Sequence, residues 1–84
     1  MRKDTLIQIN SAVGMLENKC LNDKYEDDYK PMSLDEAIKY AMYCFKEEMG
    51  STYGFNTAVK FDGIENIKNE IAKQIKENKN IELV

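Results

Sequence analysis

Apolar residues recur every three or four positions in three separate stretches of this chain, and this spacing constrains the fold more than any other feature. Residues so spaced lie along one face of an α-helix, and an apolar face has to be buried against another element. The first stretch predicts a helix from about Thr5 to Leu21, with Asp4 or Thr5 capping its start. Its apolar face would consist of Leu6, Ile9, Val13, Leu16 and Cys20.

The second stretch carries signals for both ends of a helix. Ser33 and Glu36 have the spacing of a capping box, in which the serine hydroxyl accepts from the Glu36 amide and the glutamate reaches back to the Ser33 amide. Gly50 can adopt the left-handed conformation that ends a helix. We therefore expect a helix over about Leu34–Met49.

The third stretch is an isoleucine-rich segment near the end of the chain. It predicts a helix over about Ile64–Lys76, with Asp62 in the capping position before it. The three apolar faces should meet in one core. We expect the most buried residues to include Leu6, Ile9, Val13, Leu16, Leu34, Ile38, Ala41, Phe45, Ile67, Ile71 and Ile75.

The segment between the second and third helices is ambiguous. Apolar and polar residues alternate over Phe55–Phe61, and a period of two predicts a short strand. A competing interpretation starts a short helix at Asn56 or Thr57. The tail, Asn80–Val84, alternates weakly and either pairs with this strand or frays. The expected fold class is therefore mostly α: a small three-helix domain, with a minor two-stranded β element if these two segments pair.

A chain of 84 residues is long enough for one domain and too short for two, so a single domain over residues 1–84 is expected. A domain of this size has a small core, which makes oligomerisation a plausible supplement to its stability. The apolar spacing of the first helix also suits a coiled-coil-like contact, so a homodimer stays open as an alternative.

The sequence favours a cytoplasmic location. No apolar run approaches the roughly 18 residues that a membrane-spanning helix needs. The charged start of the chain, Met1–Asp4, is not followed by the apolar stretch of a secretory signal. Cys20 and Cys44 fall among apolar residues. We interpret them as reduced, buried thiols rather than a disulfide, because cytosolic chains rarely keep disulfide bonds.

The side chains offer little for catalysis. The chain has no histidine, so it lacks the commonest general base and the commonest metal ligand. The acidic run from Asp23 fails as a calcium loop, because its sixth residue is Asp28 instead of glycine and its twelfth is Leu34 instead of glutamate. No glycine-rich phosphate loop is present. The sequence therefore predicts a protein that is not an enzyme and holds no metal ion or cofactor.

Charge is spread unevenly along the chain, whose net charge is −3. Residues 17–48 contain nine acidic residues and five lysines, whereas the residues from 49 onward are balanced. The lysines of the third predicted helix are interleaved with glutamates, which weakens the positive field that nucleic-acid binding requires. We therefore expect a protein partner with a basic surface, and no direct contact with nucleic acid.

The first candidate binding segment is acidic and aromatic. It consists of Tyr25, Glu26, Asp27, Asp28 and Tyr29. Carboxylates steer encounter with a positive partner, and tyrosine supplies a large contact area. The competing interpretation is a solvated connection whose tyrosines cover the edge of the core.

The second candidate segment follows the second helix. It consists of Tyr53, Phe55, Asn56, Thr57 and Lys60. Aromatic walls, hydroxyl and amide groups and one lysine could form a pocket for a small ligand such as a nucleotide. The competing interpretation is a helix–strand connection whose aromatic residues enter the core.

Together these features favour a small binding module over an enzyme. The first hypothesis is an inhibitor or regulator that acts through its acidic middle on a basic, nucleic-acid-handling protein. A phage or mobile-element counter-defence protein is one concrete form, suggested by size and charge. The alternative hypotheses are a small-ligand or nucleotide-binding sponge and a structural subunit of a larger assembly.

Overall fold

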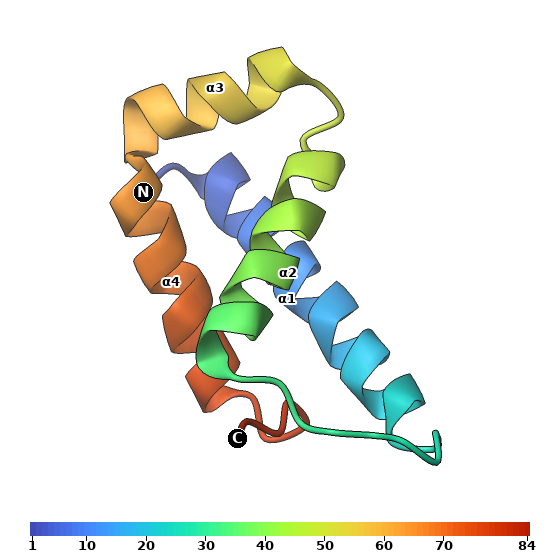
Figure 1. The fold of residues 1–84 in the computed structure, drawn as a ribbon. Helices are drawn as coiled ribbons and strands as arrows, with labels where there is room; N and C mark the ends of the chain where they lie inside the picture. The colour runs from blue at the N-terminus through green and yellow to red at the C-terminus, as the bar shows by residue number, and fades with distance from the viewer.

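The chain forms four α-helices and no strand in a computed structural model that describes residues 1–84 (Figure 1). The helices are α1 (Lys3–Asp23), α2 (Leu34–Glu48), α3 (Thr52–Asp62) and α4 (Ile64–Glu77). α1 packs against α2 and α4, and α2 packs against α4. α3 lies across one end of these three helices and joins α2 to α4 (Figure 1). None of the four combines the length and the apolar character that a bilayer crossing requires.

α2 begins and ends close to where the sequence predicts. The Ser33 hydroxyl accepts a hydrogen bond from the Glu36 amide at 3.1 Å, which confirms half of the capping box. The other half differs, because the Ser33 hydroxyl also donates to the Glu36 carboxylate at 3.1 Å. Gly50 follows the helix with φ +74°, the left-handed conformation that was expected of it.

α1 is longer than predicted at both ends, and its buried face is turned from the predicted one. Thr5 is 0% exposed, whereas Leu6, which we expected in the core, is 37% exposed. The cause is the end of α3, because Asp62 lies against the first turn of α1 and accepts a hydrogen bond from Thr5. The predicted cap is also wrong, since α1 follows Arg2 without a side-chain cap.

The predicted strand over Phe55–Phe61 is wrong, because this segment forms most of α3. The competing helical interpretation has the right type, although the helix begins earlier, at Thr52. The Ser51 hydroxyl caps it by accepting from the Gly54 amide at 3.1 Å. A helix satisfies its own backbone hydrogen bonds, whereas a strand needs a neighbouring strand, and the chain supplies none.

The C-terminal tail does not form the second strand that was the other half of the expected β element. Leu83 forms an isolated parallel bridge with Met32, and the Val84 amide donates to the Met32 carbonyl at 2.9 Å. Ile81 is buried against the core. The tail therefore fastens the segment before α2 instead of pairing with Phe55–Phe61.

The core fills the space between α1, α2 and α4, and most of the predicted core residues are confirmed. Leu34 and Ile38 are only partly buried. Ala12, Ala37 and Ala58 are fully buried, although they were not among the residues expected to be most buried. Their small side chains let neighbouring backbones approach, which a periodicity argument does not weigh. The confirmed core residues are Ile9, Val13, Leu16, Ala41, Phe45, Ile67, Ile71 and Ile75.

Cys20 and Cys44 are free and buried, as the sequence indicates. Burial raises the pKa of both thiols above the usual value, because loss of water disfavours the thiolate. The reactive form is therefore scarce at neutral pH. Both side chains act as small apolar groups in the core.

Candidate protein-binding site

The acidic loop, which we define as Tyr25–Tyr29, lies in the connection between α1 and α2. It occupies the end of the molecule opposite α3 (Figure 1). Two consecutive turns shape it: the Glu26 amide donates to the Asp23 carbonyl at 3.0 Å, and the Tyr29 amide donates to the Glu26 carbonyl at 3.2 Å. The structure thus holds the first candidate segment together as a folded, projecting surface.

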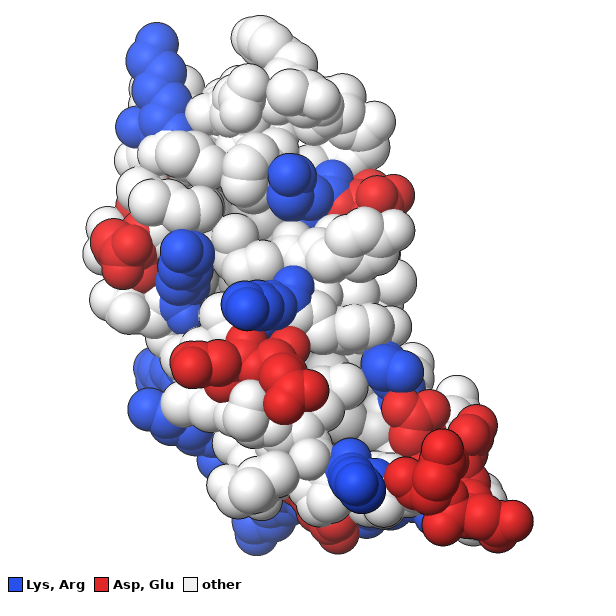
Figure 2. Space-filling view, in the orientation of Figure 1, with Lys and Arg blue, Asp and Glu red and all other residues white.

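The carboxylates of the loop are exposed, and Lys19 and Lys30 border the same depression as Glu26 and Asp28 without pairing with them. Glu26, Asp27 and Asp28 form no ion pair with any residue of the chain. Asp23, one turn earlier, does pair with Lys19 at 2.9 Å, and this hydrogen bond raises the pKa of Lys19. Figure 2 shows a dense group of acidic side chains at this end of the molecule. The loop therefore presents concentrated negative charge to a partner.

The two tyrosines of the loop have different roles. Tyr25 is 91% exposed, so it does not cover the core edge. Tyr29 is partly buried, and its hydroxyl donates to Glu82 Oε2 at 3.2 Å. Partial burial together with the Glu82 carboxylate raises the pKa of the Tyr29 phenol. Tyr29 therefore anchors the loop, while Tyr25 is left free for contact.

Glu82 is the residue of this site that sequence reasoning missed. Its carboxylate accepts a hydrogen bond from the Tyr29 hydroxyl and also forms an ion pair with Lys24 Nζ at 3.3 Å. It is brought there by the tail, which is fixed by burial of Ile81 and by the bridge from Leu83 to Met32. The weak alternation of the tail was interpreted as a strand that pairs with Phe55–Phe61 or frays, so it gave no signal for the contacts of Glu82.

Replacing this anchor should loosen the loop without unfolding the protein. We expect Glu82→Ala to speed amide hydrogen exchange over residues 24–30 about fivefold, because an exposed ion pair contributes about 1 kcal/mol at most. Exchange in α2 should not change. Glu77→Ala removes a glutamate with no ion pair and should leave the loop as it is. Equal exchange in both variants would show that Glu82 does not hold the loop.

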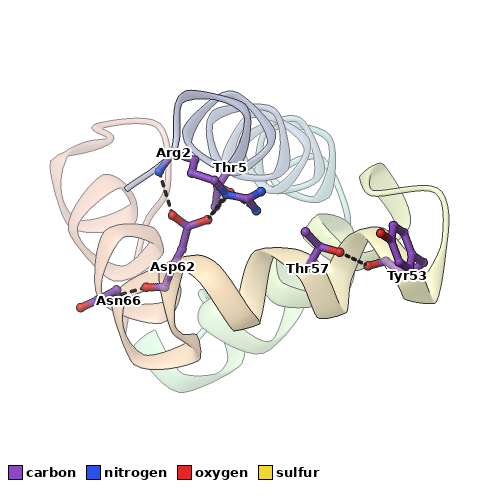
Figure 3. A network of polar contacts seen from close by, with 6 residues as sticks. All are labelled: Arg2, Thr5, Tyr53, Thr57, Asp62 and Asn66. Atoms are coloured by element: carbon purple, nitrogen blue, oxygen red, sulfur yellow. Dashed lines mark hydrogen bonds and ion pairs between the residues drawn. The ribbon is translucent and has the colours of Figure 1, made fainter.

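The second candidate segment lies on α3, and the helix separates its members. Phe55 turns toward the core and meets Phe45 edge-on, with ring centroids 6.0 Å apart. Thr57 donates its hydroxyl to the Tyr53 carbonyl at 2.8 Å, within the helix (Figure 3). Only Phe55 and Asn56 line the groove of about 350 Å³ beside the start of α3. Tyr53, Thr57 and Lys60 lie outside that groove, so the five residues do not form one pocket.

A buried polar network ties α3 to the start of α1 (Figure 3). The Asp62 side chain is 2% exposed. Its carboxylate accepts from the Arg2 amide at 2.7 Å, from Arg2 Nε at 3.0 Å and from the Thr5 hydroxyl. The predicted cap on α4 is wrong, because Gly63 takes that position without a side-chain bond.

This network is structural rather than a site for a ligand. Burial alone raises the pKa of Asp62, but hydrogen bonds from the Thr5 hydroxyl and from Arg2 lower it more, so the net pKa lies below its usual value. The ionised carboxylate is therefore satisfied by protein donors. Every buried side-chain nitrogen and oxygen in the chain has a hydrogen-bond partner.

Comparisons with known proteins give no match to a family model, a curated protein or a solved structure. No group of three or more histidine, cysteine, aspartate or glutamate side chains is arranged to hold a metal ion. The acidic loop combines three carboxylates that form no ion pair with one exposed aromatic ring.

Proposed function

We propose that this protein is a non-enzymatic binding module whose acidic loop docks on a basic surface of a partner protein. The observation that carries the proposal is the combination of Tyr25, 91% exposed, with three carboxylates that the chain itself does not neutralise. Charge alone would give a weak and nonspecific contact. An aromatic ring in the same loop supplies the apolar area that interface hot spots require.

The way the loop is held supports this role. Two backbone turns and the contacts of Glu82 fix Tyr29 and Lys24, so the loop is ordered before a partner arrives. A preordered surface loses less conformational entropy on binding than a flexible one. Unpaired carboxylates also speed encounter with a positive surface, and this effect weakens as salt increases.

The partner class follows from the same chemistry. Proteins that handle nucleic acids carry basic surfaces that contact phosphates. A row of carboxylates on a folded loop competes for such a surface, and this makes the protein an inhibitor or regulator of its partner. A counter-defence protein of a phage or mobile element is one setting for an inhibitor of this size and charge.

Affinity capture with matched variants tests the proposal. The protein is immobilised and exposed to an extract of the cells in which it is made, and the recovered proteins are compared between variants. Asp27→Lys with Asp28→Lys reverses the loop charge, and Tyr25→Ala removes the exposed ring. We expect each loop variant to lose the same basic partner by about tenfold or more.

The control reverses an equal amount of charge elsewhere. Glu47→Lys with Glu48→Lys changes two exposed glutamates near the end of α2 that form no ion pair. This variant should recover the partner as well as the unmodified protein does. Equal loss in both charge reversals would mean that net charge acts without a specific surface. No loss in the loop variants would remove the acidic loop from the function.

A further inference from the structure

A groove between α2 and α4 forms a second surface with marked chemistry. It is an open groove of about 610 Å³, within the range of roughly 300–1,000 Å³ that is typical of binding sites. Its apolar lining comes from Ile38, Met42 and Ala72, together with the ring of Tyr43. Ile38 and Met42 are partly buried against the core. The groove floor is therefore apolar and continuous with the core.

Three lysines surround this floor. Lys39 and Lys46 come from α2 and Lys68 from α4, and all three are exposed. None of them forms an ion pair, and Asp35 is the single carboxylate in the lining. Figure 2 shows lysine side chains over the face that α2 and α4 share in Figure 1, with a group of acidic side chains directly below them. An occupant of the groove should therefore be acidic and carry an apolar or aromatic group.

The acidic loop of the same chain has this chemistry. Glu26, Asp27 and Asp28, which form no ion pair, are opposite in charge to the three lysines of the groove. Of these lysines, Lys46 also lies over the Phe55 ring, with its Nζ 5.1 Å from the ring centroid. The exposed ring of Tyr25 matches the apolar floor. Complementary charge of this kind fixes the orientation of a contact and increases its rate of formation.

The loop cannot reach the groove of its own molecule while the structure is intact. It lies in the α1–α2 connection and projects from the end of the molecule opposite α3 (Figure 1). Glu82 holds it there through Tyr29 and Lys24. The complementary surfaces can therefore meet only between two copies. A contact between two different patches of identical chains is heterologous, so it extends head to tail instead of closing as a symmetric dimer.

We infer that the α2–α4 groove receives the acidic loop of a second copy of this chain, so that the protein assembles head to tail. The inference rests on the proposed binding role of the loop and names a second partner for it. A loop of five residues covers a small area, below the roughly 1,200 Å² of stable interfaces, so the assembly should be weak and depend on concentration. Assembly would also withhold the loop from any other basic partner.

Sedimentation velocity on purified protein tests this inference. The unmodified chain, whose mass is 9.7 kDa, should associate as its concentration increases, and less so in high salt. The loop variant, Asp27→Lys with Asp28→Lys, and the groove variant, Lys39→Glu with Lys68→Glu, should each stay monomeric. A mixture of the two should associate again, because the intact loop of one variant meets the intact groove of the other.

A charge reversal outside both surfaces serves as the control. Glu47→Lys with Glu48→Lys lies outside both surfaces and should associate like the unmodified chain. A monomer at every concentration, or a mixture that stays monomeric, would overturn the head-to-tail assembly. The groove variant keeps the acidic loop, so its capture of a basic partner reports on the proposed function separately. Lost assembly with retained capture would leave that function standing.

Discussion

Phe45→Ala should destabilise the protein by about 3–5 kcal/mol, the usual cost of truncating a fully buried phenylalanine. Phe45 is 0% exposed. Its ring also meets Phe55 edge-on at 68°, a pairing that adds about 0.5–1.5 kcal/mol. This single ring links α2 to both the central core and α3, so its loss empties the centre and loosens the helix across the end.

A loss of about 3–5 kcal/mol is a large part of the total free energy of unfolding of so short a chain. At about 0.05–0.15 kcal/mol per residue, 84 residues give about 4–13 kcal/mol in total. The melting temperature should fall by about 12 °C or more, because 1 kcal/mol corresponds to about 4–8 °C in a domain of this size. Urea denaturation measures the change directly.

A matched aromatic control is available on the surface. Tyr25→Ala removes a ring that is 91% exposed and should change the free energy of unfolding by less than about 0.5 kcal/mol. A loss of under about 1 kcal/mol for Phe45→Ala would contradict the core described above. So would equal losses for the two variants.

Asp62→Asn should destabilise the protein by about 2–3 kcal/mol at neutral pH. The substitution keeps the size of the side chain but removes the charge that three donors from Arg2 and Thr5 share. A hydrogen bond to an ionised group contributes about 1.5–3 kcal/mol, and the amide of asparagine places a donor where an acceptor is needed. Asp28→Asn removes an exposed, unpaired carboxylate and should have almost no effect.

The pH dependence of this loss identifies its cause. The folded pKa of Asp62 lies below its unfolded value of about 3.9. The carboxylate is ionised in both states above that value, so its full stabilising effect is present there, and it disappears as the pH falls through the lower folded pKa. The difference between unmodified protein and Asp62→Asn should be constant near neutrality and shrink in acid. A difference that persists unchanged at pH 2 would show that the charge is not responsible.

The three long helices could be predicted from sequence because their signals are local. Spacing identifies an apolar face, and Ser33 and Gly50 mark the ends of α2 within a few residues. The local sequence did not distinguish a strand from a helix in the segment that forms α3. An alternating run fits a strand or a helix, and the choice depended on whether the distant tail would pair with it. The tail pairs with Met32 instead.

The error at Leu6 has the same origin. A single stripe can be drawn through Leu6 or through Thr5, and local spacing does not choose between them. Asp62, 57 residues away, accepts a hydrogen bond from the Thr5 hydroxyl, and this contact places Thr5 instead of Leu6 on the buried face. A buried threonine on an apolar face is explained only once its partner is known.

In the candidate site, too, local features could be predicted from the sequence, whereas contacts between distant residues could not. The composition of the acidic loop is visible in five consecutive residues, and its role in binding stays a prediction. The anchor at Glu82 was not visible, because it is 53 residues from Tyr29. The α2–α4 groove was also hidden, because it forms only when Lys39 and Lys68, on separate helices, come together around Met42.

The most direct test of the central claim is a hydrogen-exchange footprint of the protein bound to the partner that affinity capture recovers. We expect new protection over residues 22–32, which carry the acidic loop, and unchanged exchange over α3. Protection confined to residues 52–62 with an unaffected loop would contradict the claim that the acidic loop is the binding surface.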